Sequence, residues 1–154
     1  AQDRPDPLGA ERIEFLAAAT AVQPPRPLRK VASGGELSRI SLAIEVATIG
    51  LDSVQTMVFD EVDSGISGAV ADIVGSRLRA LGEHRQVLCV THLPQVAAKG
   101  HTHYRVSKAP VEGMTQSAVQ RLDATAREEE VARLLGGVEI SDEARAAARK
   151  LLAV

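Results

Sequence analysis

Two short, largely apolar segments with an amphipathic segment between them constrain the fold of this chain most. Residues 56–59 and 87–90 are apolar and partly β-branched, and polar residues follow each of them directly. Between them, residues 67–81 carry apolar side chains at helical spacing and end at Gly82. Strand, helix and strand in this order predict an α/β fold with a mostly parallel sheet flanked by helices.

Polar residues stand where these two strands end. Asp60 and Glu61 follow the first strand, and His92 follows the second. Ligands of open α/β sheets bind at the carboxyl ends of the strands. Neighbouring residues at a strand end point to opposite faces, so we expect the two acids to have different roles. In nucleotide hydrolysis the first acid typically holds Mg²⁺, often through water, and the second orients and deprotonates the attacking water.

Each of these signals has a simpler reading when taken alone. Asp60 and Glu61 are equally compatible with a solvated acidic turn. An isolated histidine such as His92 more often caps a strand or bonds a loop carbonyl than contacts a phosphate. The functional reading depends on several such features lying at the ends of strands in one sheet.

A third feature lies upstream, where Ser33, Gly34 and Gly35 precede a predicted helix over residues 36–50. The backbone N–H groups of a helix N-terminus point outward, and the helix dipole favours negative charge there. Adjacent glycines let the backbone approach an anion, and the Ser33 hydroxyl adds a donor. The tripeptide is also compatible with an ordinary N-cap. Together with the strand-end residues, it predicts part of an ATPase site.

These segments resemble the motifs of ABC-type ATPases. Residues 32–36, Ala-Ser-Gly-Gly-Glu, are similar to the signature motif, and residues 56–61 to Walker B with its catalytic glutamate. Residues 62–67 resemble the D-loop, and His92 resembles the switch histidine. A narrower resemblance, to bacterial SMC-like DNA repair proteins, rests on four stretches and runs from about Ile13 to the C-terminus. These stretches are residues 30–39, 59–68, 90–97 and 132–137.

The resemblance implies a fold and an activity. It implies an ABC-type head that is divided by a long antiparallel coiled coil and acts at DNA double-strand breaks. Two such heads would form a homodimer that sandwiches two ATP molecules between the protomers. The signature residues would contact the ATP held by the partner protomer; they are Ser33, Gly34, Gly35 and Glu36.

The resemblance also implies roles for residues after the strands. Asp60 would hold Mg²⁺ through water, Glu61 would be the general base, and His92 would contact the γ-phosphate. Asp63 and Ser64 would belong to the D-loop that crosses the dimer interface.

The chain departs from the family pattern in three places. Ala32 replaces the usual leucine of the signature, and Glu36 replaces its final glutamine. Ser67 occupies the usual position of the D-loop aspartate, so the role of Asp63 is left open.

The sequence contains no Gly-x-x-x-x-Gly-Lys-Ser/Thr motif, the loop that cradles the α- and β-phosphates. We therefore interpret residues 31–154 as the C-terminal lobe of an ABC/SMC-type P-loop NTPase head, with residues 1–30 as an N-terminal strand and proline-rich lead-in. The N-terminal Walker A lobe and the coiled coil are expected to be missing. Alone, this lobe should bind ATP weakly and hydrolyse it hardly.

Composition narrows the remaining classes of function. The net charge of −2 gives no basic field for DNA, and the few aromatic residues form no base-stacking platform. Binding to DNA double-strand ends is thus implied by the resemblance alone. No apolar run approaches the length of a membrane span. The single Cys89 is read as buried filler that suits a reducing cytoplasm, so we expect a cytoplasmic, nucleoid-associated protein.

The other elements follow from local patterns. We expect a strand over 13–17, an extended linker over 23–27, because proline blocks both a helix and a central strand, and a short helix over 94–98. A hairpin is predicted from residues 101–107 and 115–122. Two final helices are predicted over 126–135 and 142–152, the second capped by Ser141.

Two groups of charged or titratable residues receive a structural reading. His101 and His103 are expected on one face of a strand, where exposed histidines are a better interpretation than a metal pair because no third ligand has suitable spacing. Arg145, Arg149 and Lys150 on the last helix are read as a solvated face.

Two other functions remain compatible with the motifs. The chain could belong to another SMC-like recombination ATPase, or it could be a noncatalytic dimerisation module with the same fold. Glu61 argues against the second, because hydrolysis needs a carboxylate at that position.

Overall fold

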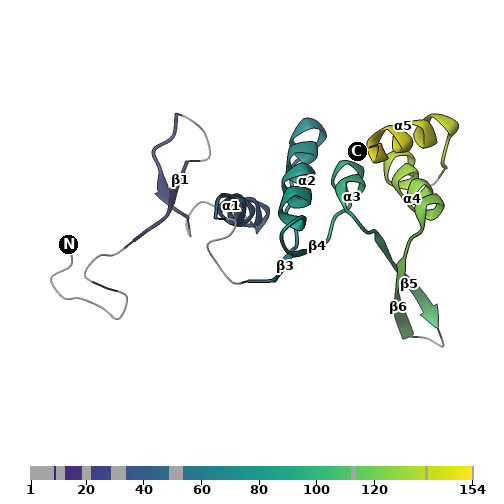
Figure 1. Ribbon diagram of the computed structural model, residues 1–154, viewed down its shortest axis with the longest axis horizontal. Helices are drawn as coiled ribbons and strands as arrows, with labels where there is room; N and C mark the ends of the chain where they lie inside the picture. The colour runs from purple at the N-terminus through teal and green to yellow at the C-terminus, as the bar shows by residue number, and fades with distance from the viewer. Residues whose placement is uncertain are drawn as a thin grey trace.

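The computed structural model describes residues 9, 13–18, 22–28, 34–48, 54–111, 114–137 and 139–153. Figure 1 shows the elements following one another along the long axis of the molecule, with the hairpin β5–β6 projecting away from the helices. In chain order they are β1 (Leu16–Ala17), β2 (Arg26–Pro27), α1 (Gly34–Ala47), β3 (Thr56–Phe59), α2 (Gly68–Gly82), β4 (Gln86–Cys89), α3 (Pro94–Lys99), β5 (Tyr104–Val111), β6 (Met114–Arg121), α4 (Ala124–Gly136) and α5 (Asp142–Leu152).

Strands β3 and β4 form the parallel pair that the sequence predicts. Thr56 lies opposite Gln86, and Phe59 lies opposite Cys89. The ladder continues past both ends of the strands, where the Gln86 amide donates to the Gln55 carbonyl and the Val90 amide to the Phe59 carbonyl. Helix α2 connects the strands, which confirms the predicted strand–helix–strand unit and the α/β fold class.

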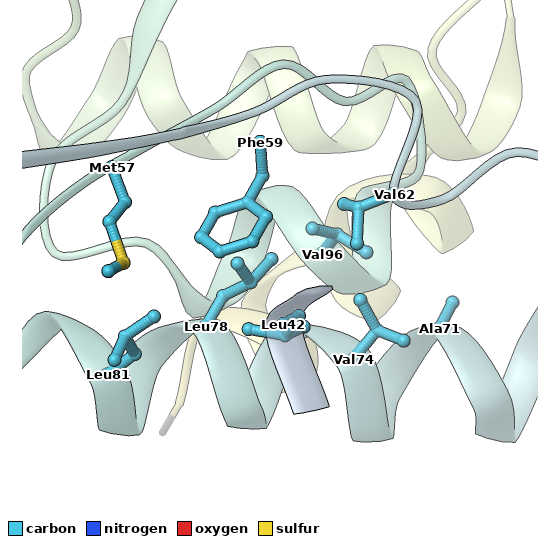
Figure 2. Close-up of a cluster of buried hydrophobic side chains, with 9 residues drawn as sticks. All are labelled: Leu42, Met57, Phe59, Val62, Ala71, Val74, Leu78, Leu81 and Val96. Atoms are coloured by element: carbon cyan, nitrogen blue, oxygen red, sulfur yellow. The ribbon is translucent and has the colours of Figure 1, made fainter. Parts of the chain in front are cut away.

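The main core lies between this pair of strands and helices α1, α2 and α3. Strand β3 alternates, with Met57 and Phe59 buried and Thr56 and Val58 exposed, as a half-covered strand should. Figure 2 shows Met57 and Phe59 pointing at the inner face of α2. The buried side chains of this core are Leu42, Met57, Phe59, Val62, Ala71, Val74, Leu78, Leu81 and Val96.

Helices α4 and α5 form a second small core around Val131, Ala132 and Ala148. Side chains cap both helices, because Asp123 accepts from the Ala126 amide and Ser141 from the Ala144 amide. The cap predicted at Ser141 is therefore confirmed.

The sequence suggests that the basic residues of α5 form a solvated face, but two of them also form ion pairs with α4. Arg145 Nε lies 2.8 Å from Glu129 Oε1, and Arg149 Nε lies 2.8 Å from Glu128 Oε1. Both arginines therefore link α5 to α4, and their charge is matched by carboxylates.

The N-terminal region differs from the sequence prediction. Residues 23–27 were expected to be an extended linker, without a helix or a central strand, but Arg26 and Pro27 form the short strand β2, antiparallel to β1. Proline is tolerated here because the pair has only two strands, so an edge position without an N–H donor is available. The predicted strand over 13–17 is reduced to its last two residues.

Helix α1 begins at Gly34, two residues before the predicted start, while residues 49 and 50 lie outside the described part of the chain.

The two histidines before the hairpin do not form the predicted strand pair, because β5 begins only at Tyr104. His101 Nε2 lies 2.8 Å from Glu83 Oε1, whereas His103 is half-buried and its Nδ1 has no hydrogen-bond partner in the described structure. Burial, and secondarily the charge of Arg127, lowers the pKa of His103. No group of three or more metal-ligating side chains occurs among the described residues.

In the part of the chain that the structure describes, no helix combines the length and apolar character needed to cross a membrane.

We expect Leu81→Ala to destabilise the fold strongly, because the Leu81 side chain of α2 is fully buried in the main core. Removal of such a side chain costs about 2–5 kcal/mol of the free energy of unfolding. Urea denaturation followed by circular dichroism measures this cost. Leu37→Ala on the half-exposed side of α1 is the matched control and should cost about 1 kcal/mol or less; equal losses would contradict the assignment of the core.

Candidate functional site

A tight turn at the end of β3 carries four of the predicted site residues, namely Asp60, Glu61, Asp63 and Ser64. It spans Asp60 to Ser64 and closes through the Ser64 amide, which donates to the Glu61 carbonyl at 3.0 Å. Glu61 has φ of +56°, a left-handed conformation that non-glycine residues rarely adopt. Such backbone strain persists only where the surrounding structure holds it, and it is frequent at functional sites.

The two acids that follow β3 are exposed at this turn. The Asp60 carboxylate accepts from the Glu61 amide at 2.9 Å, which orients the first acid relative to the second. The described residues offer no cage of several metal ligands here. Mg²⁺ typically binds through one or two carboxylates and completes its shell with waters and phosphates, so a lone exposed Asp60 fits the ion only together with a phosphate ligand.

Asp63 lies on the other side of the same turn, and only 3% of its surface is exposed. Its Oδ2 accepts from the Thr91 hydroxyl at 2.5 Å and from the His92 amide at 3.1 Å, and it lies 3.5 Å from His92 Nδ1. The Thr91 hydroxyl oxygen in turn accepts from the Leu93 amide at 3.1 Å. The buried carboxylate therefore fixes the backbone after β4 and places His92 beside the turn that carries Glu61.

The sequence did not indicate these contacts within one chain. It assigned Asp63 to a loop that crosses a dimer interface and gave no role to Thr91. The hydroxyl group of Thr91, which lies between the end of β4 and His92, was the one sequence feature that could have indicated this network. Its partner, Asp63, lies 28 residues away in sequence.

The first turn of α1 packs against the same turn. A Cβ atom on Gly34 would lie 2.7 Å from Glu61 Oε2, and one on Gly35 would lie 2.8 Å from Ser64 Cβ and 3.0 Å from the Glu61 carbonyl oxygen. A side chain on Gly35 would meet a Cβ atom and a backbone oxygen, which cannot move aside, whereas one on Gly34 would meet only the end of the flexible Glu61 side chain. Packing within this chain therefore requires glycine at position 35, in addition to the anion approach that the sequence suggested.

The structure therefore brings most of the predicted residues together. Gly34, Gly35 and the turn carrying Asp60, Glu61, Asp63 and Ser64 are in contact, and His92 joins them through Asp63. Glu36 lies partly buried in the first turn of α1. Ser33 lies outside the described residues.

Cys89 has no place in this chemistry. It is partly buried on β4 and packs against the main core. Burial, with smaller contributions from the charges of Asp63 and Asp60, raises the pKa of its thiol to about 12. Because the thiolate is the nucleophilic form, the structural reading of this cysteine is supported.

The fold is that of an SMC-type ATPase head. It is similar to a solved structure from work on the structural biochemistry of ATP-driven dimerisation and DNA-stimulated activation of SMC ATPases. The TM-score is 0.56 over 84% of this chain and 77% of that chain, at 18% sequence identity. No family model matches the sequence.

Sequence relatives narrow this class. The chain is 74% identical to DNA repair protein RecN of Xylella fastidiosa strain Temecula1, 51% to RecN of Vibrio cholerae and 40% to RecN of Bacillus subtilis. These alignments cover 97%, 95% and 94% of this chain, but only 27%, 26% and 25% of the relatives. Over the part that it spans, the chain belongs to the RecN family. It spans about a quarter of the length of these curated relatives, at their C-terminal part. The narrower resemblance predicted from the four sequence stretches is confirmed.

We expect Asp63→Asn to loosen the segment after β4, because a neutral amide oxygen accepts more weakly than a carboxylate oxygen from the Thr91 hydroxyl and the His92 amide. Hydrogen bonds to charged groups contribute about 1.5–3 kcal/mol and those between neutral groups about 1 kcal/mol, so the loss should be about 1–2 kcal/mol. Urea denaturation and amide exchange at His92 measure the two effects. Asp72→Asn is the control, because Asp72 is half-exposed in its pair with Lys99 and should cost about 1 kcal/mol or less. Wild-type exchange at His92 in Asp63→Asn would refute the role of the carboxylate.

Native Cys89 should react slowly with iodoacetamide at pH 8, because its raised pKa leaves little thiolate. The rate should be at least about 100-fold lower than in urea-unfolded chain, whose thiol has a pKa near 8.5. Alkylation followed by mass spectrometry between pH 7 and 10 checks this. The rate should still be rising with pH at the upper end of that range, and a plateau near pH 9 would show an ordinary thiol.

Proposed function

We propose that this chain is the C-terminal part of an ATP-hydrolysing head that acts in the repair of DNA double-strand breaks. The observation that carries the proposal is the single cluster formed by the first turn of α1, the turn with Glu61 and the segment with His92. The RecN name of the relatives and the SMC-type fold support the same activity.

The residues of the cluster suit three tasks. Glu61 is exposed and held in a left-handed conformation, so it is the candidate general base that orients the attacking water. His92 is exposed next to Asp63 of the same turn and is the candidate contact to the γ-phosphate. Asp60 would hold Mg²⁺ through water, and the bound ion would neutralise charge that develops on the phosphates.

The proposal includes a head-to-head homodimer. Gly34, Gly35 and Glu36 stand at the N-terminus of α1, where, with Ser33, they would contact the ATP of the partner protomer. Asp63 and Ser64 would lie at the interface through the turn that they share with Glu61. The contacts of Gly34 and Gly35 within the chain support a rigid signature turn that could be presented to a second head.

A second partner is the N-terminal lobe with Walker A. In the described residues β4 bonds only to β3, which leaves its other edge unpaired. A cavity of about 450 Å³ lies along β4 and extends to α2, α3 and the start of β5. Leu88, Val90 and Tyr104 are exposed in this region although they are apolar. These features support the insertion of a strand from the other lobe between β4 and the hairpin.

DNA itself would be contacted mainly by other parts of the protein. The chain carries a net charge of −2, and the arginines of α5 bond to carboxylates of α4. A bacterial DNA repair protein of this kind would work in the cytoplasm, in association with the nucleoid.

The test is Glu61→Gln in the longer protein that we propose carries this chain. The change keeps the shape of the side chain and removes the base, so we expect ATP turnover to fall at least about 100-fold while ATP binding is retained. Steady-state hydrolysis and binding of a fluorescent ATP analogue measure the two properties. The isolated chain should show almost no turnover.

Glu83→Gln is the matched control, because Glu83 is an exposed acid at the far end of α2, paired with His101. It should hydrolyse ATP like the wild type. If the wild-type protein binds ATP and dimerises but shows no turnover, the chain belongs to a noncatalytic dimerisation module and the catalytic roles are withdrawn.

A further inference from the structure

Two side chains of α1 hold the turn that carries Glu61, and neither has a role in the proposed function. Ser38 Oγ donates to the Asp60 carbonyl at 2.8 Å. Arg39 Nη1 donates to the Ser64 carbonyl at 2.8 Å and, at 3.4 Å, to the Val62 carbonyl. The two residues therefore bond to backbone oxygens on both sides of Glu61.

The guanidinium of Arg39 lies close to Gly35. A Cβ atom on Gly35 would lie 3.1 Å from Arg39 Nη1, in addition to its clashes with the turn. Arg39 stands four residues after Gly35, so both lie on the same face of α1. The guanidinium thus lies between the first turn of α1 and the turn after β3.

Glu61 is the residue that needs such support. Its left-handed conformation is unfavourable for a non-glycine residue. The hydrogen bond from the Ser64 amide to the Glu61 carbonyl closes the turn. Charge-assisted hydrogen bonds from an arginine to carbonyl oxygens are stronger than bonds between neutral groups. Asp63 anchors the turn on the opposite side, toward His92.

We propose that Arg39, assisted by Ser38, is a positioning residue that clamps the Asp60–Ser64 turn to α1 and thereby holds Glu61 in its catalytic conformation. The proposal rests on the proposed ATPase function. It adds a direct mechanical link, because any movement of α1 when its N-terminus engages the ATP of the partner protomer is transmitted to the general base of the same chain.

The first measurement needs only this chain. We expect Arg39→Ala to raise the hydrogen-exchange rate of the Ser64 amide at least about 10-fold, since the turn loses its charge-assisted bonds. Heteronuclear NMR of the wild type, Arg39→Ala, Arg39→Lys and Arg77→Ala resolves this amide. Arg77 is the matched control, because it lines the same groove between α1 and α2 as Arg39 and makes none of the described contacts to the turn. Its variant should exchange like the wild type.

The second measurement uses the longer protein. Arg39→Ala should lower kcat for ATP hydrolysis about 10-fold and change KM less than about 2-fold, because the residue acts on the base and touches no substrate. Arg39→Lys, which retains a charged donor, should recover part of kcat. Thermal denaturation shows whether Arg39→Ala is folded. If it is not, the kcat of Arg39→Lys tests the positioning role instead.

The outcomes separate the two proposals. Wild-type exchange at Ser64 together with wild-type kcat in Arg39→Ala would overturn the positioning role and leave the ATPase function intact. If the Ser64 amide exchanges rapidly in Arg39→Ala but the wild-type protein hydrolyses no ATP, the proposed function is overturned. The bonds from Arg39 to the turn then remain as a structural contact only. A rise in KM with unchanged kcat would also overturn the positioning role.

Discussion

The buried carboxylate of Asp63 is the interaction on which the arrangement of the site depends. It is almost fully shielded from solvent, and its described contacts are the Thr91 hydroxyl and the backbone and ring of His92. A buried charge is tolerated only when donors satisfy it, so the segment after β4 has little freedom to move away. This constraint fixes the distance between the loops that end the two parallel strands. The exposed acids and His92 can therefore be placed accurately without being buried themselves.

Close packing of glycine backbone supplies the second constraint. Gly35 lets the first turn of α1 approach the turn after β3 more closely than any side chain would allow. A motif that sequence reasoning explains by the approach of an anion is therefore also explained by contacts inside one chain. The two explanations are compatible. Contact with the turn after β3 holds the N-terminus of α1 in place, so its outward N–H groups point in a fixed direction.

Periodicity and turn residues were sufficient to predict most of the fold. The parallel unit, the hairpin and the cap at Ser141 depend on local patterns that the sequence displays directly. The site could be predicted as a set of residues, but not as a network, because its bonds join segments distant in sequence: Arg39 reaches Ser64, and Thr91 reaches Asp63. The strand at Pro27 was missed for a different reason, since an edge position that tolerates proline exists only once a partner strand is present.

The charge balance of the cluster explains why it should need a partner. Three carboxylates, those of Asp60, Glu61 and Asp63, lie in one short turn. The arginine that contacts the turn, Arg39, gives hydrogen bonds to backbone carbonyls. A triphosphate would carry further negative charge into this region, and its repulsion by the acids is incompletely screened at such short range. In the proposed function, the cations that make ATP binding favourable would come from outside the described cluster, namely from a bound divalent ion and from basic side chains of the proposed N-terminal lobe. If Glu61 is the general base, as we propose, hydrolysis would depend on assembly, because the charges that hold the substrate would lie elsewhere.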